Sequence, residues 1–183
     1  MEYKKHKFPV QLLIFFEKVS PSFWSSKVSR ANCFFLFLPS SLSLHLSVLL
    51  KNELFLGSSY LVDASCVDLK QPSSVCSASS KALVFYMYYF FFLKKRIIFC
   101  FSMAQQLQSI DYVYPSAGWL EREFSEMFGV YLDRKLDSRN LLLDYSLNEN
   151  PLLKSFPSVG FREVHYSMLA ESVVYTSAAA VEL

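Results

Sequence analysis

The sequence predicts an α+β fold in which an antiparallel β-sheet packs against helices and an extended arm follows toward the C-terminus. Two apolar runs, residues 83–93 and 97–101, flank a short basic stretch and are typical of a β-hairpin buried on both faces, because their apolar residues do not alternate with polar ones. Residues 117–128 carry apolar side chains at helical spacing. Residues 148–157 contain two prolines and few periodic apolar residues, which favours an irregular arm or an ordinary surface loop.

The composition favours one domain with large apolar surfaces. A chain of 183 residues can bury a sizeable core. It is 52% hydrophobic and 17% aromatic, which is more apolar than an ordinary soluble monomer. Biased codon usage and burial against partner subunits would each explain this excess, and both explanations stay open. The net charge of +2 is too small to indicate binding to nucleic acid or to anionic lipid.

The first part of the chain is expected to differ from the rest. We divide the sequence into a helical or irregular region, residues 1–46, and an α+β domain, residues 47–183. Within the first region, residues 8–19 predict a helix with its apolar residues on one side, and residues 21–32 are polar and predict a loop. A second helix is expected within residues 42–56, ahead of a glycine.

Further strands are expected where β-branched and aromatic residues gather. Residues 60–67 predict a strand, and the serine-rich residues 68–81 predict a loop. Residues 110–114 predict another strand before a proline. Residues 161–166 alternate as a strand would, and residues 172–176 are its candidate partner.

The predicted helix at residues 117–128 has recognisable ends. Ser116 suits the N-cap, and Gly129 lies where a left-handed C-cap would fall. At about 100° per residue, one face gathers Leu120, Phe124, Met127 and Phe128. On the other face Arg122 and Glu126 are spaced as an i, i+4 pair.

Glu123 is expected beside the apolar stripe of this helix. A carboxylate in that place needs a donor, since burying it alone costs several kcal/mol. Arg139 is the first candidate and Arg162 the second. Glu121 points to a different face of the helix, so the two carboxylates do not form the acid and base pair of a hydrolase.

No motif indicates catalysis, a metal or a cofactor. The four cysteines and three histidines lack ligand spacing; they are Cys33, Cys66, Cys76, Cys100, His6, His45 and His165. We expect four buried thiols in a reducing compartment. Four glycines are too few for the glycine-rich loops that bind phosphates or dinucleotides, and no Gly-x-Ser-x-Gly motif is present.

No transmembrane helix is expected. Residues 83–93 are too short, since a spanning helix needs about 20 apolar residues. Residues 33–50 have sufficient length, but a proline, a histidine and several serines interrupt them. The first thirty residues form a poor import sequence, so the protein is made inside the organelle that uses it or carries an address that cannot be read.

The most informative part of the sequence is a set of short motifs between residues 118 and 166. They are G-W-L-E-R-E-F-S-E-M-F-G-V at 118–130, L-L-D-Y at 142–145, P-L at 151–152, Lys154, F-P at 156–157 and G-F-R-E-V at 160–164. In this order they resemble the signature of a core subunit of respiratory complex I, the 30 kDa subunit, which is called NADH dehydrogenase subunit 9 in mitochondria and has a bacterial counterpart.

The resemblance has departures that indicate a divergent mitochondrial member. Glu126 stands where the family usually has Asp, and Ser125 where it has Trp. Asn140 replaces an arginine, which leaves Asp137 and Arg139 as the matches in that run. The motifs cover about a quarter of the chain.

The resemblance implies a non-catalytic structural subunit of mitochondrial NADH:ubiquinone oxidoreductase without a cofactor of its own. It would scaffold the quinone module of the matrix arm, at the matrix side of the inner membrane. Its partners would be the quinone-site core subunit and neighbouring iron-sulfur subunits. The alternative is a small peripheral protein whose aromatic segments dip into a membrane surface. The residues expected to serve structure or interfaces are Trp119, Glu121, Arg122, Glu123, Phe128, Gly129, Arg139, Asp144, Tyr145, Pro151, Lys154, Phe156, Pro157, Gly160 and Glu163.

Overall fold

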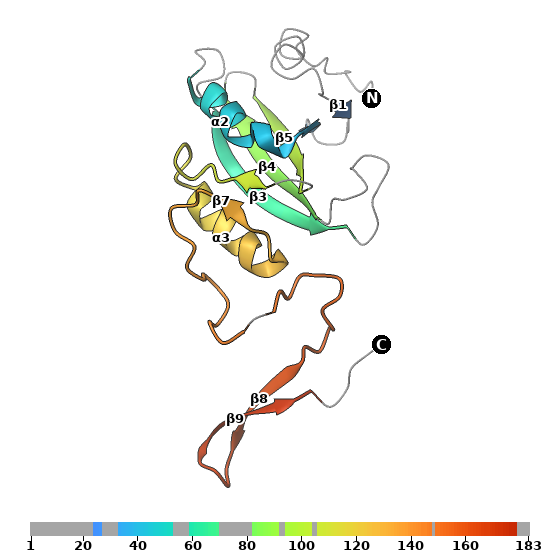
Figure 1. Ribbon diagram of the computed structural model, residues 1–183, viewed down its shortest axis with the longest axis vertical. Helices are drawn as coiled ribbons and strands as arrows, with labels where there is room; N and C mark the ends of the chain where they lie inside the picture. The colour runs from blue at the N-terminus through green and yellow to red at the C-terminus, as the bar shows by residue number, and fades with distance from the viewer. Residues whose placement is uncertain are drawn as a thin grey trace, which may run out of the picture.

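A five-stranded sheet forms the body of the molecule (Figure 1). The computed structural model describes residues 24–26, 33–52, 59–69, 82–91, 94–103, 106–147 and 149–178. The strands are β1 (Trp24–Ser26), β2 (Cys33–Leu38), β3 (Ser59–Asp68), β4 (Ala82–Phe90) and β5 (Lys95–Ser102), in the spatial order β1-β2-β5-β4-β3. The predicted hairpin is β4 with β5, and the predicted strand at 60–67 is β3.

The pairing of the strands makes the sheet mixed. β3, β4 and β5 form an antiparallel series, as the sequence predicts. β2 instead lies parallel to β5, and β1 pairs antiparallel with β2. β1 lies within residues 21–32, so the expectation of a loop there is wrong for residues 24–26. The division near residue 46 stays a prediction, although β2 precedes it and lies in the same sheet as β3 to β5.

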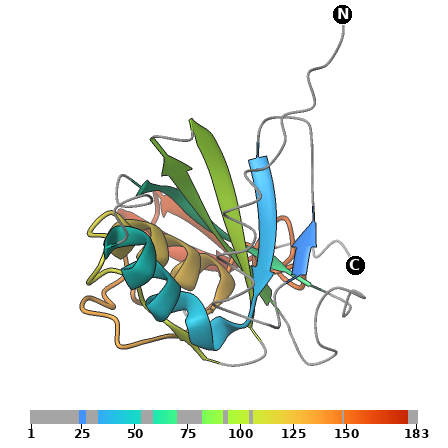
Figure 2. The ribbon, with the colours of Figure 1, turned by 90° about the horizontal axis from the view of Figure 1, so that it is seen from above.

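Two helices lie on one face of the sheet (Figure 2). A 3₁₀ turn, η1 (Ser40–Leu42), leads into α2 (Ser43–Asn52), and α3 (Ala117–Phe128) follows later in the chain. The main core lies between these helices and the sheet. Its largest fully buried side chains are Tyr86, Tyr88, Phe90, Phe99, Phe101, Leu36, Leu46, Leu50, Ile97, Leu107 and Ile110.

Tyrosine hydroxyls in this core keep hydrogen-bond partners. The Tyr88 hydroxyl lies 3.1 Å from Ser47 Oγ on α2, and the Tyr114 hydroxyl lies 3.0 Å from Ser59 Oγ. Burial raises the pKa of both tyrosines, so both stay protonated at neutral pH. These contacts explain how a core rich in tyrosine avoids the cost of unsatisfied polar groups.

Residues 110–114 form a turn, and the expectation of a strand there is wrong. The N–H groups of Val113 and Tyr114 both donate to the carbonyl of Ile110. The short strand lies just before this turn, where β6 (Leu107–Gln108) pairs in parallel with β7 (Leu132–Asp133). The turn therefore brings residues 109–111 close to the chain that follows α3.

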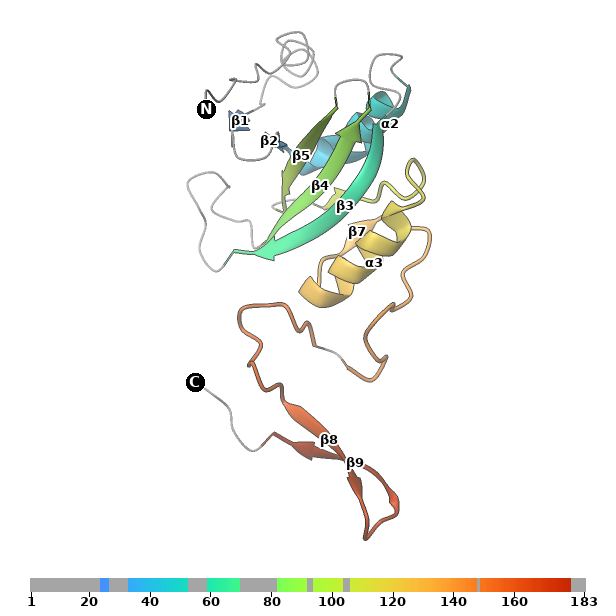
Figure 3. The ribbon, with the colours of Figure 1, turned by 180° about the vertical axis from the view of Figure 1, so that it is seen from behind.

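A second antiparallel hairpin projects from the body, as Figure 3 shows. β8 (Arg162–Ser167) pairs with β9 (Ser172–Ser177), so the predicted pairing of residues 161–166 with 172–176 is confirmed. Most side chains of both strands are exposed. A chain of turns, residues 149–161, joins this hairpin to the body.

Several expectations fall on residues that the structure does not describe. The predicted helix at 8–19 lies outside the described residues, as do most of the predicted loops at 21–32 and 68–81. The helix expected within 42–56 is α2, and residues 53–56 lie outside the described part. Within the described ranges, no helix is long and apolar enough to cross a membrane.

The C-terminal end of α3 generates a test of stability. Gly129 has a φ of 65°, and a Cβ placed there would lie 2.6 Å from Asn150 Nδ2. We expect Gly129→Ala to lower the free energy of unfolding of the full chain in urea by about 1–3 kcal/mol, because the left-handed backbone and the close contact both oppose a side chain. Adding Asn150→Ala to this variant should recover the part of the lost free energy of unfolding that comes from the close contact with Asn150.

The matched control is the other glycine of this helix. Gly118 lies inside α3, and a Cβ there would meet Asp111 Cβ at an ordinary 3.9 Å. Gly118→Ala should therefore stabilise the chain by about 0.5–1 kcal/mol. A Gly129→Ala variant as stable as Gly118→Ala would contradict the assignment of Gly129 as a strained cap.

Candidate functional site

A buried carboxylate on α3 is the centre of the site. Glu121 is fully buried, and both of its oxygens accept hydrogen bonds. Oε1 accepts from the Tyr86 hydroxyl at 2.9 Å and from the Ile110 N–H at 3.0 Å. Oε2 accepts from Ser109 Oγ at 2.5 Å and from Lys135 Nζ at 3.1 Å. One side chain therefore joins β4, the turn after β6 and the segment after β7.

The Glu121–Lys135 ion pair is almost completely removed from solvent. The Lys135 side chain is 6% exposed and the Glu121 side chain 0%. Burial, followed by the nearby charge of Glu121, raises the pKa of Tyr86 well above its ordinary value, so Tyr86 remains a donor. Both charges of a buried pair must be compensated, and here neutral donors complete the shell around the carboxylate.

The expected position of Glu123, beside the apolar stripe and paired with a buried cation, is wrong. Glu123 is exposed, whereas the buried residues of α3 are Ala117, Glu121 and Phe124. Phe128 and Leu120 pack against this core from its margins. The helix is turned so that Glu121 faces the sheet, because its four donors compensate the carboxylate there.

Lys135 is the functional partner that the sequence reasoning missed. The expected partner of Glu123, Arg139, instead forms an ion pair with Asp137 at 2.8 Å, and Arg162 lies on the exposed β8. Lys135 follows the predicted helix by only a few residues, and this closeness in the chain was the one signal that could have suggested it as a partner for a carboxylate of the helix. No periodicity marked it, since residues 130–139 are irregular apart from β7.

Arg122 organises the loop on the outer side of α3. Its Nε donates to the carbonyl of Arg139 at 2.7 Å, and its NH2 group donates to the carbonyl of Asn140 at 3.0 Å. Asp137 accepts from Arg122 at 3.4 Å. The guanidinium also lies 5.3 Å from the centre of the exposed Trp119 ring. Arg122 thus binds the main chain of residues 139–140 and does not form the expected i, i+4 pair with Glu126.

Glu126 holds the next part of the same loop. Its oxygens accept from the N–H groups of Leu141, Leu142 and Leu143, the last two at 3.0 Å. Partial burial alone would raise the pKa of Glu126, but these three N–H groups and the positive charge of Arg122 outweigh it and lower the pKa. The expected Arg122–Glu126 pair is therefore replaced by two adjacent side chains that bind consecutive pieces of one loop.

Asp137 and Arg139 form an exposed pair within this loop. The Arg139 side chain is the main cause that holds the pKa of Asp137 well below its ordinary range, and the Arg139 N–H adds to it. Because the pair is exposed, it shapes the loop and contributes little to stability. Asp144 similarly closes the next turn by accepting from Ser146 Oγ at 2.9 Å.

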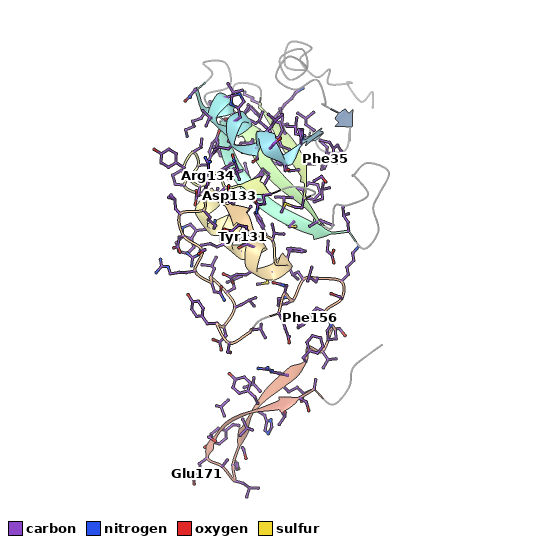
Figure 4. All side chains as sticks on the ribbon, in the orientation of Figure 1. Phe35, Tyr131, Asp133, Arg134, Phe156 and Glu171 are labelled. Carbon is purple, nitrogen blue, oxygen red and sulfur yellow. The ribbon has the colours of Figure 1, made fainter. Side chains whose placement is uncertain are left out.

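Exposed aromatic residues surround the end of α3. A hollow of about 780 Å³ lies between this end and residues 130–150. Tyr131 and Tyr145 line it and are each 70% exposed. Figure 4 shows Tyr131, Asp133 and Arg134 projecting beside β7. Trp119, one of the expected interface residues, is 63% exposed on the same helix.

The segment after this loop contacts the body at two places. The Leu152 N–H donates to the carbonyl of Met127, and the Lys154 N–H donates to Asp68 Oδ2 at 2.9 Å. Phe156 stacks edge-on against Phe161, with ring centres 5.4 Å apart. Pro151 and Pro157 are half-buried, and Gly160 has a φ of 80° at the entry to β8.

The β8–β9 hairpin has one apolar face. Val164 lies opposite Tyr175, and Tyr166 lies opposite Val173, so these four side chains share a face. Each of them is 58–61% exposed. Glu163 lies on the other face, opposite Thr176. A two-stranded hairpin without a covered face is marginally stable by itself.

The geometry supports structure and binding rather than a reaction. The buried Glu121 is closed off by its donors, and the half-buried Glu126 holds main chain. Within the described ranges, no group of three His, Cys, Asp or Glu residues could hold a metal ion.

The Glu121 network generates a prediction about stability. Glu121→Ala in the full chain should lower the free energy of unfolding by about 3–5 kcal/mol, because it leaves the Lys135 ammonium buried without its partner. Glu123→Ala on the exposed side should change it by no more than about 0.5 kcal/mol. Urea denaturation measures both. Equal losses in the two variants would refute this assignment of the helix face.

Glu126 generates a prediction about pH. Its pKa is lowered in the folded chain, so its contribution is present above the ordinary value of 4.5 and disappears as the pH falls through the lowered pKa. We expect the amides of Leu141, Leu142 and Leu143 to lose protection from hydrogen exchange over that interval, after correction for intrinsic rates. Glu126→Gln should abolish the pH dependence, and Glu123→Gln should retain it. Unchanged protection in acid would contradict the capping role.

Comparison with known proteins places these features in a family. The family model described as respiratory-chain NADH dehydrogenase, 30 Kd subunit, matches residues 39–162. The chain is 43% identical to NADH-ubiquinone oxidoreductase subunit 9 of Paramecium primaurelia, over 96% of this chain and 87% of that protein. It is 29% identical to a subunit of the NADH-quinone oxidoreductase of Roseobacter denitrificans, over 84% of this chain and 80% of that protein.

A solved structure shares the fold. A chain from a membrane-bound sulfane sulfur reductase, an archaeal respiratory membrane complex, has a TM-score of 0.62 and 16% identity, over 82% of this chain and 86% of that one. At this identity the likeness concerns the fold alone. The family model covers more than half of the sequence, including α3 and the loop that Arg122 and Glu126 hold. The chain therefore belongs to the 30 kDa subunit family of the respiratory-chain NADH dehydrogenase.

Proposed function

We propose that this chain is a non-catalytic structural subunit of mitochondrial NADH:ubiquinone oxidoreductase, which scaffolds the quinone module in the arm on the matrix side of the inner membrane. Family membership supports this role, and so do the Paramecium relatives named as subunit 9 of the enzyme. The alternative of a small peripheral protein at a membrane surface lacks such support. The chain would carry no cofactor and would support electron transfer from NADH to ubiquinone by holding neighbouring subunits in place.

The exposed β8–β9 hairpin carries this proposal. It offers four apolar side chains in two facing pairs on one surface, and its tip adds Met168 and Leu169, which are 87% and 102% exposed. Exposed apolar patches that are contiguous mark interaction sites in soluble proteins. The Tyr131 and Tyr145 side chains add exposed aromatic area near the C-terminal end of α3, and Trp119 adds more in its first turn. Aromatic residues of this kind are enriched where subunits meet.

We assign the hairpin face and the hollow beside α3 to different partner subunits, because one surface is apolar and the other is polar. The apolar hairpin face suits a permanent interface with the quinone-site core subunit, since permanent interfaces are more apolar than transient ones. The polar hollow beside Tyr131, with Arg134 and Glu149 in its lining, suits the rim of a contact with a neighbouring iron-sulfur subunit. The expected structural residues Lys154, Phe156 and Pro157 lie between these surfaces and would set their spacing.

The hairpin provides the test of this function. Val173→Lys places a charge on the apolar face and should reduce the amount of assembled complex at least about tenfold, since a charge buried without a partner costs several kcal/mol. Thr176→Lys is the matched control, because it is another β-branched residue of β9 but lies on the polar face opposite Glu163. A native gel stained in place for NADH oxidation measures the assembled complex.

The outcomes separate a scaffold from other roles. Assembly should fall in Val173→Lys while the turnover of each complex that does assemble remains normal. Full assembly of Val173→Lys, or equal losses in both variants, would refute the assignment of the apolar face. Migration of the unaltered chain as a small species that salt or carbonate extracts would favour the membrane-surface alternative instead.

A further inference from the structure

The β8–β9 hairpin has two edges to which no described strand is bound. The hairpin projects from the body in Figures 1 and 3, and within the described residues its strands pair only with each other. Each strand of such a pair directs half of its N–H and C=O groups outward, away from the other strand. These outward groups can bind a further strand, so each edge is a possible site for strand addition.

The register shows which main-chain groups of β9 point outward. The Ala178 N–H donates to the Phe161 carbonyl at 3.1 Å, which makes these two residues a hydrogen-bonded pair. Bonded and non-bonded pairs alternate along an antiparallel ladder, so the non-bonded positions of β9 are Val173, Tyr175 and Ser177. Their N–H and C=O groups therefore point away from β8. Two of the three residues also supply the apolar side chains of β9.

The sequence of β9 does nothing to block pairing with another chain. Edge strands commonly carry charges, prolines or bulges, or are very short. β1 has three residues, and β3 has a bulge between Leu61 and Asp63. β8 carries Arg162, Glu163 and His165. β9 reads S-V-V-Y-T-S, with no charge, proline or bulge, and its valines, tyrosine and threonine favour strands. Among the described edge strands longer than three residues, only β9 lacks these protections.

Open space lies at the C-terminal end of β9. A hollow of about 500 Å³ has as its lining residues Glu149, Phe161, Arg162, Tyr175, Thr176 and Ser177. Tyr175 and Thr176 are neighbours in a strand, so their side chains lie on opposite faces of the hairpin. The hollow therefore reaches round the strand and is not confined to one face. It leaves room for the end of an added chain to enter.

We propose that an extended segment of the partner subunit adds to β9 as a third strand of this sheet. The inference rests on the proposed function, in which a partner covers the apolar face of the hairpin. The added strand binds the outward N–H and C=O groups of Val173, Tyr175 and Ser177. Apolar side chains at every second position of the added strand continue the apolar face, since alternate residues of a strand share a face.

Strand addition also explains how the hairpin becomes stable. A two-stranded hairpin is marginal in water, whereas three strands with a covered apolar face are stable. Main-chain hydrogen bonds supply binding, and the apolar side chains beside Val173 and Tyr175 supply specificity. A partner that only lay across the apolar face would cover both strands and would bind neither edge. The two edges therefore distinguish strand addition from docking on the face.

Hydrogen exchange with single-amide resolution in the assembled complex tests the proposal. The amides of Val173 and Tyr175 should exchange about a hundredfold or more slowly than in the isolated full chain, after correction for intrinsic rates. Val164 and Tyr166 are the matched control, because they lie on the same apolar face at non-bonded positions of β8, with their N–H groups at the other edge. Their amides should slow by less than about tenfold.

Proline provides a second test that leaves the apolar side chains in place. Ser177→Pro removes an outward N–H, and its ring blocks the edge, so incorporation in competition with the unaltered chain should fall about fivefold. Ser177→Ala keeps the N–H and should change incorporation by less than about twofold. Arg162→Pro makes the same change at the opposite edge, directly across from Ser177. It should lower incorporation no more than Arg162→Ala does.

The outcomes separate this proposal from the proposed function. Equal slowing at both edges, or equal losses for the two proline variants, would overturn strand addition but would still fit a scaffold whose hairpin face is covered. Unchanged exchange at Val173 and Tyr175 would also overturn it. If the isolated full chain forms dimers that slow these two amides, a second copy occupies the edge and the proposal is wrong. Full assembly of Val173→Lys would instead count against the covered face on which both proposals depend.

Discussion

The buried carboxylate of Glu121 is the interaction on which the described structure depends most. Four donors from separate parts of the chain converge on it, one each from β4 and Lys135 and two from the turn after β6. An apolar residue at this position would pack against the sheet but would leave these donors without an acceptor. The charge therefore specifies how α3 lies on the sheet, whereas hydrophobic burial alone would allow several rotations of the helix.

The fixed orientation of α3 also determines how the loop on its outer side is held. With Glu121 directed inward, Arg122 and Glu126 are directed to the loop on the outer side. Each binds main-chain groups of residues 139–143, so this loop is held without regular secondary structure. The exposed Trp119 and Tyr145 lie on or beside these elements. A rigid base for exposed aromatic residues suits a protein that positions its neighbours, since preorganised surfaces lose less entropy on binding.

Local patterns in the sequence predicted the elements but not every orientation. The left-handed C-cap of α3 at Gly129 and the β4–β5 hairpin were predictable, because a glycine after a helix and long apolar runs are local signals. The predicted N-cap role of Ser116 is wrong, because Ser116 has helical backbone angles and its side chain makes no capping hydrogen bond. The burial of Glu121 in place of Glu123 was not predictable, since periodicity placed Glu123 beside the apolar stripe and cannot show donors that come from distant segments. The same limit explains residues 110–114, where apolar residues suggested a strand but the Ile110 N–H binds Glu121. The parallel pairing of β2 with β5 joins residues about sixty apart, and no local pattern encodes it.

The contrast between the body and the hairpin indicates how the protein would become ordered. The body has a core with many fully buried aromatic residues, and most of its strand contacts join sequence neighbours in a hairpin or meander. β8 and β9 have no comparable core, and most of their side chains remain exposed. Local stability follows buried apolar contact, so the hairpin should open at much lower free energy than the sheet. Its apolar face would then gain order when a partner covers it. A stable body that presents a weakly stable hairpin can fold first and assemble afterwards, which couples the last ordering step to incorporation in the complex.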